Sequence, residues 1–173
     1  NIFTPLNSGV AVGPFIFSIE AILYTLFMYP IVIRILDYGY KAAERMALTS
    51  VAAIIISAII ELIAALSTKG ASVETFRLFS YYIFSSIGTI AGVWVAIAIV
   101  IALRKKNVSC YVIIPLAIAV STVIHAVFYY GGYSLVNWNF TAYTLNMFLG
   151  TVIGKAVCVG LSVVCYLINQ TVW

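Results

Sequence analysis

Five long apolar stretches run through this sequence, and they constrain the fold more than any other feature. The stretches are Val10–Ile33, Met46–Leu66, Phe79–Leu103, Val112–Tyr130 and Tyr143–Ile168. Each is close to or above the roughly 20 residues that a helix needs to cross the hydrocarbon core of a bilayer. Since a helix satisfies its own backbone hydrogen bonds in lipid, the pattern predicts transmembrane helices.

The composition agrees with this prediction. Hydrophobic residues make up 64% of the 173 residues and charged residues only 8%, and the mean hydropathy is +1.14. A water-soluble domain is not expected from these values. Without a tandem repeat or a linker, residues 1–173 are predicted to form one all-α domain, a compact bundle of five transmembrane helices in the cell membrane. Pro14 and Pro30 would allow a broken first helix, in which case a short sixth helix exists.

The charged connections predict how the bundle lies in the membrane. Three basic residues occur in the connection from Arg34 to Arg45 and three in that from Arg104 to Ser109. The connection from Ser67 to Leu78 has two, and that from Gly131 to Phe140 has none. Because lysine and arginine are enriched in cytoplasmic loops, we expect the N-terminus outside and the C-terminus inside.

Lys155 stands near the centre of the last apolar stretch. Placing a charged side chain there costs at least about 2.5 kcal/mol, so it should face protein or water. Other polar or amphipathic side chains fall at the midplane or in the outer half of the predicted spans, namely Glu20, Glu61, Trp94, His125 and Asn146. Together with Lys155 they predict an outward-facing cavity that holds a polar or zwitterionic solute between Glu20 and Lys155, with Trp94 against its ring.

The same residues also have purely structural explanations. Lys155 can pair with a carboxylate that fixes the register of two helices. Glu61 is close enough to the interface for its carboxylate to reach water. His125 and Asn146 can hydrogen-bond across helices, as buried polar side chains in membrane bundles often do.

Two pairs of glycines, four residues apart, predict close helix contacts. They are Gly88 with Gly92 and Gly150 with Gly154. Glycines at this spacing let two helix backbones approach each other. We expect the third and fifth helices to meet at these pairs, and glycines that face outward instead would contact other membrane subunits.

Enzymatic and cofactor chemistry are not predicted. One histidine cannot supply two axial haem ligands, and no cluster of Cys, His and carboxylate has the spacing of a metal site. Ser121, Thr122 and His125 lie on one turn but lack a third member for nucleophilic catalysis. The three cysteines, Cys110, Cys158 and Cys165, are interpreted as small buried hydrophobic residues. The net charge of +4 reflects topology, so a nucleic-acid partner is not expected.

Parts of the chain resemble a known transporter family. The segment Ile35–Ile63, ILDYGYKAAERMALTSVAAIIISAIIELI, is similar to the inside loop and following helix of the vitamin-uptake family that includes queuosine-precursor transporters. The matching positions are Tyr38, Gly39, Tyr40, Lys41, Ala43 and Arg45. Ser121–Tyr133 and Gly154–Ile168 resemble the family's last helices. The resemblance implies the compact six-helix substrate-binding component of energy-coupling-factor importers.

Three functions remain open at this stage. The first is a membrane transporter component that binds a small solute, such as a vitamin-like or nucleobase-like metabolite. The second is a non-catalytic accessory subunit of a larger membrane complex, for example a respiratory assembly. The third is a membrane sensor domain, which would need an output segment after Trp173. The partners expected are therefore the lipid bilayer, a small solute and, for the second function, other subunits.

Overall fold

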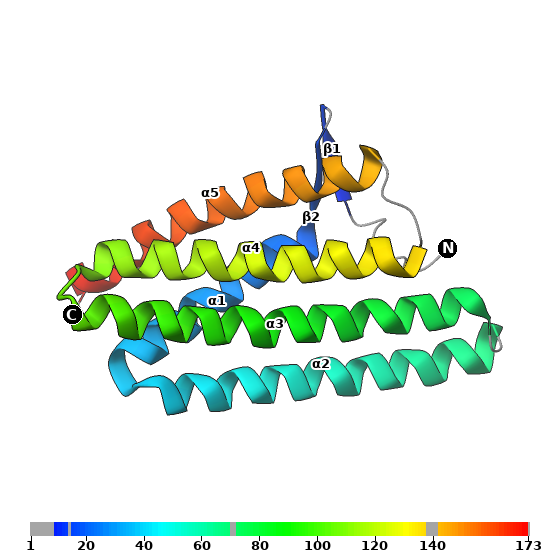
Figure 1. Cartoon of the computed structure of the whole chain (residues 1–173), viewed down its shortest axis with the longest axis horizontal. Helices are drawn as coiled ribbons and strands as arrows, with labels where there is room; N and C mark the ends of the chain where they lie inside the picture. The colour runs from blue at the N-terminus through cyan, green and yellow to red at the C-terminus, as the bar shows by residue number, and fades with distance from the viewer. Residues whose placement is uncertain (1–8, 14, 70–71, 138–141, 173) are drawn as a thin grey trace.

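The computed structural model is a bundle of five helices (Figure 1). It describes residues 9–13, 15–69, 72–137 and 142–172. The helices are α1 (Ile19–Tyr38), α2 (Tyr40–Lys69), α3 (Val73–Lys105), α4 (Cys110–Asn137) and α5 (Ala142–Val172). Each helix from α2 to α5 contains a stretch long and apolar enough to cross a membrane. The chain is therefore a helical, multi-pass membrane protein, and the part described holds no sixth helix.

The first apolar stretch is not helical throughout, so the prediction of a helix from Val10 was wrong. Residues before α1 form an antiparallel hairpin of β1 (Gly9–Val12) and β2 (Phe15–Ser18), with Gly9 opposite Ser18 and Val12 opposite Phe15. Gly13 in the turn has a φ of +60°, which glycine adopts without strain. Valine, isoleucine and phenylalanine in the flanking residues favour strands. Pro14 lies outside the described residues, whereas Pro30 lies within α1.

The central pair of the bundle is α3 and α4, with α2 on the far side of α3 and α5 beside α4 (Figure 1). α1 packs against each of the other four helices, and β2 lies against α5. The main apolar core joins α1, α3 and α4 through buried residues such as Met28, Ile97 and Ile113. The outer face of α2 exposes isoleucines, including Ile56 and Ile60, as expected for a helix in contact with lipid.

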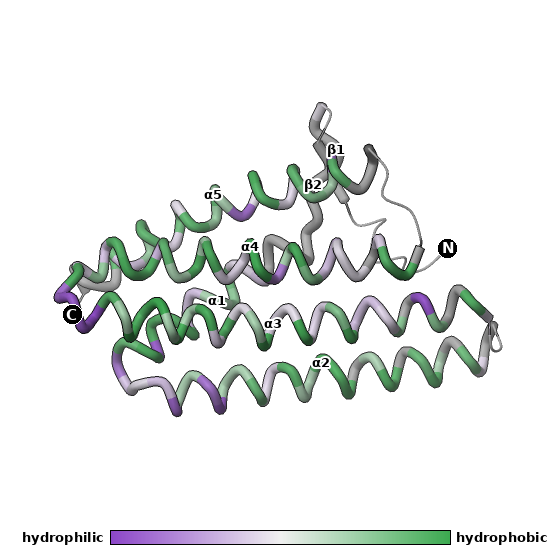
Figure 2. The backbone as a smooth tube through the Cα atoms, viewed as in Figure 1, coloured by the Kyte–Doolittle hydropathy of each residue, from purple (hydrophilic) through white to green (hydrophobic). Residues whose placement is uncertain are grey.

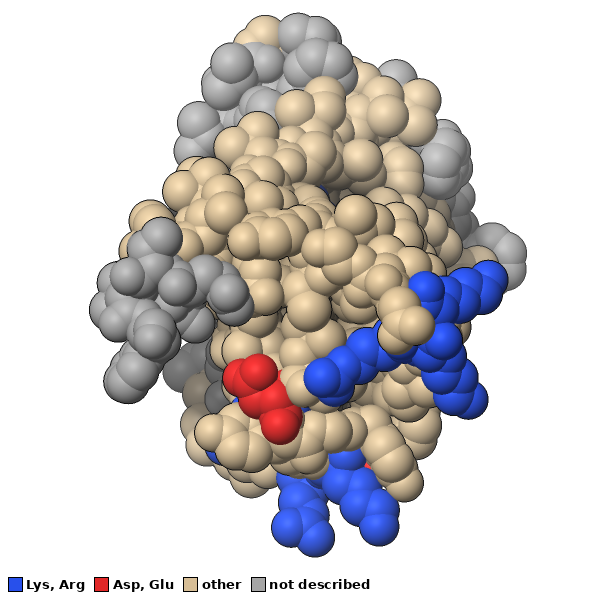
Figure 3. Space-filling view, turned by 90° about the vertical axis from the view of Figure 1, so that its left-hand side faces the viewer, with Lys and Arg blue, Asp and Glu red and all other residues tan. Residues whose placement is uncertain are grey.

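The two basic connections lie at the same end of the bundle. Figure 2 shows polar segments gathered at this end, and Figure 3 shows its lysines and arginines face on. The Arg104 guanidinium donates a hydrogen bond to the Leu36 carbonyl at 2.8 Å, which ties the end of α3 to the end of α1. Gly39, with a φ of +81°, makes the sharp turn between α1 and α2. We call this end, with its exposed residues Arg34, Lys105 and Lys106, the basic end.

Gly88 and Gly92 allow α3 to approach α4, not α5 as expected. A methyl group added at Gly92 would lie 2.9 Å from the Ser121 carbonyl oxygen and 2.5 Å from the Tyr24 hydroxyl. At Gly88 it would lie 3.2 Å from the His125 carbonyl oxygen. The short connection between α3 and α4 makes these two helices antiparallel neighbours, and both glycines of α3 face the backbone of α4.

The glycines of the last helix are also inside the bundle. Gly150 and Gly154 are buried, and α5 packs against α4, α1 and β2. Gly88 and Gly92 therefore contact α4, and Gly150 and Gly154 are covered within the bundle. Contacts of these glycines with another subunit stay a prediction.

Candidate functional site

Lys155 is the most deeply buried charged residue in the described part of the chain. Its side chain is 2% exposed, in the middle of α5. The ammonium nitrogen donates a hydrogen bond to the Thr122 carbonyl of α4 at 2.9 Å. It also lies 5.3 Å from the centroid of the Tyr24 ring of α1, within the range of a cation–π contact. Among the described side chains, no carboxylate forms an ion pair with it.

A stack of rings lies beside the lysine. The rings of Tyr24 and His125 are 3.8 Å apart between centroids and inclined by 16°. Tyr129, one turn further along α4, lies 6.2 Å from the His125 ring and nearly parallel to it. Since Tyr24 and His125 are both buried, α1 and α4 present flat ring surfaces in the interior of the bundle.

Two polar atoms of this stack have no hydrogen-bond partner among the described residues. They are the Tyr24 hydroxyl oxygen and Nδ1 of His125, and both are buried. The other ring nitrogen of His125 lies 3.4 Å from the Ser85 hydroxyl of α3. A buried polar atom without a partner costs about 1–3 kcal/mol, so such atoms are rare in native proteins and call for an explanation.

These residues form one unit, which we call the central polar cluster: Tyr24, Ser85, Thr122, His125 and Lys155. Four helices contribute to it, and its members combine one ammonium group with unused hydrogen-bonding capacity. Chemically, the arrangement can hold an anionic or strongly hydrogen-bonding group next to a flat ring.

Most other buried hydroxyl groups near the cluster are already satisfied. Thr89 and Ser121 donate to carbonyl groups of their own helices, each at 2.9 Å. Thr151 of α5 is hydrogen-bonded to the Tyr130 hydroxyl at 2.6 Å. Ser86 is an exception, since its buried hydroxyl has no partner in the described chain. In the described chain, the buried polar side-chain atoms without a hydrogen-bond partner therefore lie on α1, α3 and α4.

The structure brings together only some of the predicted site residues. His125 and Lys155 both belong to the central polar cluster. Trp94 does not belong to it, because its side chain is 51% exposed and lies beside Leu48 and Ile90 on the outer side of α3. Gly92 faces α4, and two residues further along a helix points to the opposite side. Tyr24 occupies the ring position that we had expected for Trp94.

The remaining predicted residues are placed less fully. Glu20 lies in α1 one turn before Tyr24, and Glu61 lies in α2, which packs on α3 and α1; the side chains of both are outside the described part. Asn146 is half-buried in α5, nine residues or about 13 Å from Lys155 along the helix. The outward cavity that would join these residues stays a prediction.

Three members of the cluster were missed by sequence reasoning, although Thr122 contributes only its backbone carbonyl. Tyr24 had a usable signal, because it is an aromatic residue in the middle of an apolar stretch, one turn after Glu20. Ser85 had none, since serine is common in membrane helices and often bonds to its own backbone.

The described residues contain no group of three or more His, Cys, Asp or Glu side chains that could bind a metal ion. The three cysteines are free. Cys158 is buried as predicted, Cys110 is half-buried, and Cys165 is exposed, contrary to its expected burial.

Comparisons with protein-family models, with curated proteins and with solved structures found no match. The function is therefore inferred from the geometry of the central polar cluster. The transporter-family resemblance and the six-helix fold that it implies remain predictions.

Proposed function

We propose that this protein is the solute-binding component of a transporter in the cell membrane, and that Lys155 anchors the solute in the bundle interior. One observation carries the proposal. A lysine that is 2% exposed has, among the described residues, only a backbone carbonyl as its hydrogen-bond partner. Ionisable residues at this depth are costly, and in membrane proteins they typically mark substrate or ion pathways.

The neighbours of Lys155 indicate which class of solute would fit. The ammonium group favours a carboxylate or a similar anion. The Tyr24 hydroxyl and Nδ1 of His125 are free to form hydrogen bonds, and the stacked rings of these two residues favour a planar molecule. A small aromatic acid of the vitamin or nucleobase-precursor type meets all three conditions. Glu20, one turn from Tyr24, would add a partner for a zwitterion.

A thermal-unfolding screen of the purified protein tests this function. Nicotinate, orotate and benzoate are compared with nicotinamide and benzamide, which keep the ring and lose the charge. We expect at least one acid to raise the melting temperature by several degrees at saturating concentration, with its amide much less effective. The Lys105→Met variant is the control, because Lys105 is exposed at the basic end.

Two outcomes would contradict the proposal. If the amides stabilise the protein as well as the acids do, Lys155 does not select an anion. If the chain is unstable on its own and is rescued only by one specific membrane partner, it is instead an accessory subunit.

The topology proposed for this transporter has the N-terminus outside and the basic end inside. Single cysteines at Ser72, Asn137 and Lys106 are introduced after Cys110, Cys158 and Cys165 have been replaced. A membrane-impermeant maleimide should label intact cells at Ser72 and Asn137, and at Lys106 only after permeabilisation. The reverse pattern would place the basic end outside and rule out this orientation.

A further inference from the structure

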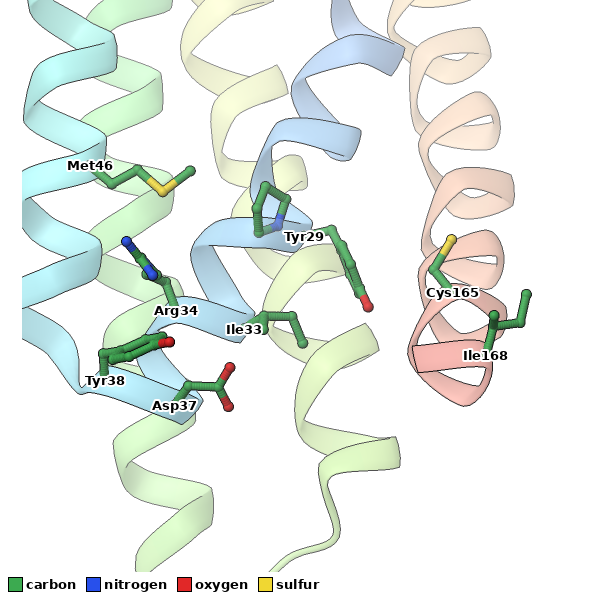
Figure 4. A pocket seen from close by; sticks show the side chains of 9 residues that line it. Tyr29, Ile33, Arg34, Asp37, Tyr38, Met46, Cys165 and Ile168 are labelled. Carbon is green, nitrogen blue, oxygen red and sulfur yellow. The ribbon is translucent and has the colours of Figure 1, made fainter. Parts of the chain in front are cut away.

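An open groove of about 820 Å³ lies at the basic end, bounded by α1, α2 and α5 and separate from the central polar cluster. Figure 4 shows α1 running between two sets of lining side chains. On one side Ile33 and Asp37 of α1 face Cys165 and Ile168 of α5, and on the other Arg34 and Tyr38 face Met46 of α2. The volume is that of a site for an organic molecule, far beyond a single ion.

The groove changes from apolar to polar along α1. Pro30 and Ile33 line it one to two turns before the end of the helix, and Asp37 and Tyr38 line it in the last turn. With a rise of 1.5 Å per residue, this change takes place over about 12 Å. Because the lining residues Cys165 and Ile168 belong to the membrane-spanning stretch of α5 and the polar part adjoins the basic connections, the groove has the same polarity profile as a phospholipid leaflet.

The polar end of the groove is suited to a phosphate group. The exposed Arg34 guanidinium lies over the Tyr38 ring at 4.7 Å from its centroid, which holds it at the groove without using its hydrogen-bond donors. Arg104, anchored to the Leu36 carbonyl, brings the exposed Lys105 and Lys106 to the same end. Asp37 also lines the groove, but no ion pair joins it to Arg34 among the described residues, and basic residues outnumber it at this end (Figure 3).

We infer that this groove binds an anionic phospholipid, with the phosphate at Arg34 and one acyl chain along Ile33 and Ile168. Arginine recognises phosphate oxygens through paired donors. Basic residues next to a membrane helix attract anionic lipids. A lipid in this position would fill the space between α1 and the end of α5 and hold the two helices in place.

Native mass spectrometry of the delipidated protein tests the inference. Phosphatidylglycerol and phosphatidylcholine with the same chains are added separately, and dissociation constants are measured for the parent protein, Arg34→Gln and Arg77→Gln. We expect phosphatidylglycerol to bind more tightly than phosphatidylcholine. Arg34→Gln should weaken phosphatidylglycerol binding by about fivefold, whereas Arg77→Gln, at an exposed residue near the start of α3 and far from the basic end, should change it by less than about twofold.

A second variant tests the apolar part, and soluble anions test the source of the phosphate. Ile33→Trp, which fills the groove, should reduce binding of phosphatidylglycerol while leaving the melting temperature of the lipid-free protein within a few degrees. Equal losses in Arg34→Gln and Arg77→Gln would show only a diffuse surface charge. If inorganic phosphate or glycerol 3-phosphate binds as tightly as phosphatidylglycerol, the groove is a site for a free anion. Either result overturns the lipid proposal.

Discussion

Replacing Lys155 by methionine is expected to raise the free energy of unfolding of the solute-free protein by about 2 kcal/mol. Methionine has a similar length and no charge, so it removes the cost of keeping an ammonium group inside the bundle. The Thr122 carbonyl that accepts its hydrogen bond keeps its place within α4. Equilibrium unfolding in mild detergent, followed by circular dichroism, measures the change.

A structural role for Lys155 predicts the opposite sign. If the lysine is held by a buried carboxylate such as that of Glu20, breaking the pair should cost about 3–5 kcal/mol. The variants Glu20→Gln and Lys155→Met are therefore measured singly and together, since paired residues give non-additive effects. Lys106→Met, a change at an exposed lysine, should shift stability by no more than about 0.5 kcal/mol. If Lys155→Met loses much of the free energy of unfolding and the double variant recovers it, the lysine serves to pair with Glu20 and does not bind a solute.

The second large effect is expected at Gly92. Even alanine there would bring a methyl group to 2.9 Å from the Ser121 carbonyl oxygen and 2.5 Å from the Tyr24 hydroxyl. α3 and α4 would have to separate and Tyr24 would have to move, so Gly92→Ala should lose about 1–3 kcal/mol of stability. The same unfolding assay measures this loss.

Gly160→Ala is the matched control for Gly92→Ala. It makes the same change within a helix, but nothing lies within 4 Å of the added methyl group. Alanine is the better helix former, so this variant should be neutral or gain up to about 1 kcal/mol. Equal effects of the two substitutions would mean that α3 and α4 do not approach each other as closely as described.

Much of the architecture was predictable because membrane helices consist of long apolar stretches of sequence. The four stretches from Met46 to Ile168 correspond to α2, α3, α4 and α5. The two basic connections lie at the same end of the bundle because helices that follow one another in the sequence are antiparallel. The prediction of a helix throughout the first stretch was wrong because hydropathy measures polarity and not backbone conformation. There, the turn at Gly13 produces a hairpin that is as apolar as a helix.

The site was predicted in part for a related reason. Lys155 and His125 were found because ionisable groups stand out in an apolar sequence, and their burial follows from the cost of exposing them to lipid. Whether an uncharged residue faces inward depends on the packing of each helix. Because the glycines of α3 face α4, Trp94 points outward. The sequence around Trp94 does not indicate this orientation.

The most direct test of a solute site at Lys155 is a binding titration of the best aromatic acid from the screen, measured by calorimetry on the parent protein and on Lys155→Met. If Lys155 anchors the solute, the variant stays folded, is at least as stable as the parent, and binds the acid at least about tenfold more weakly, as expected for the loss of a charge-assisted hydrogen bond. Equal affinity in the two proteins would show that the acid does not use Lys155 and would contradict the proposed function.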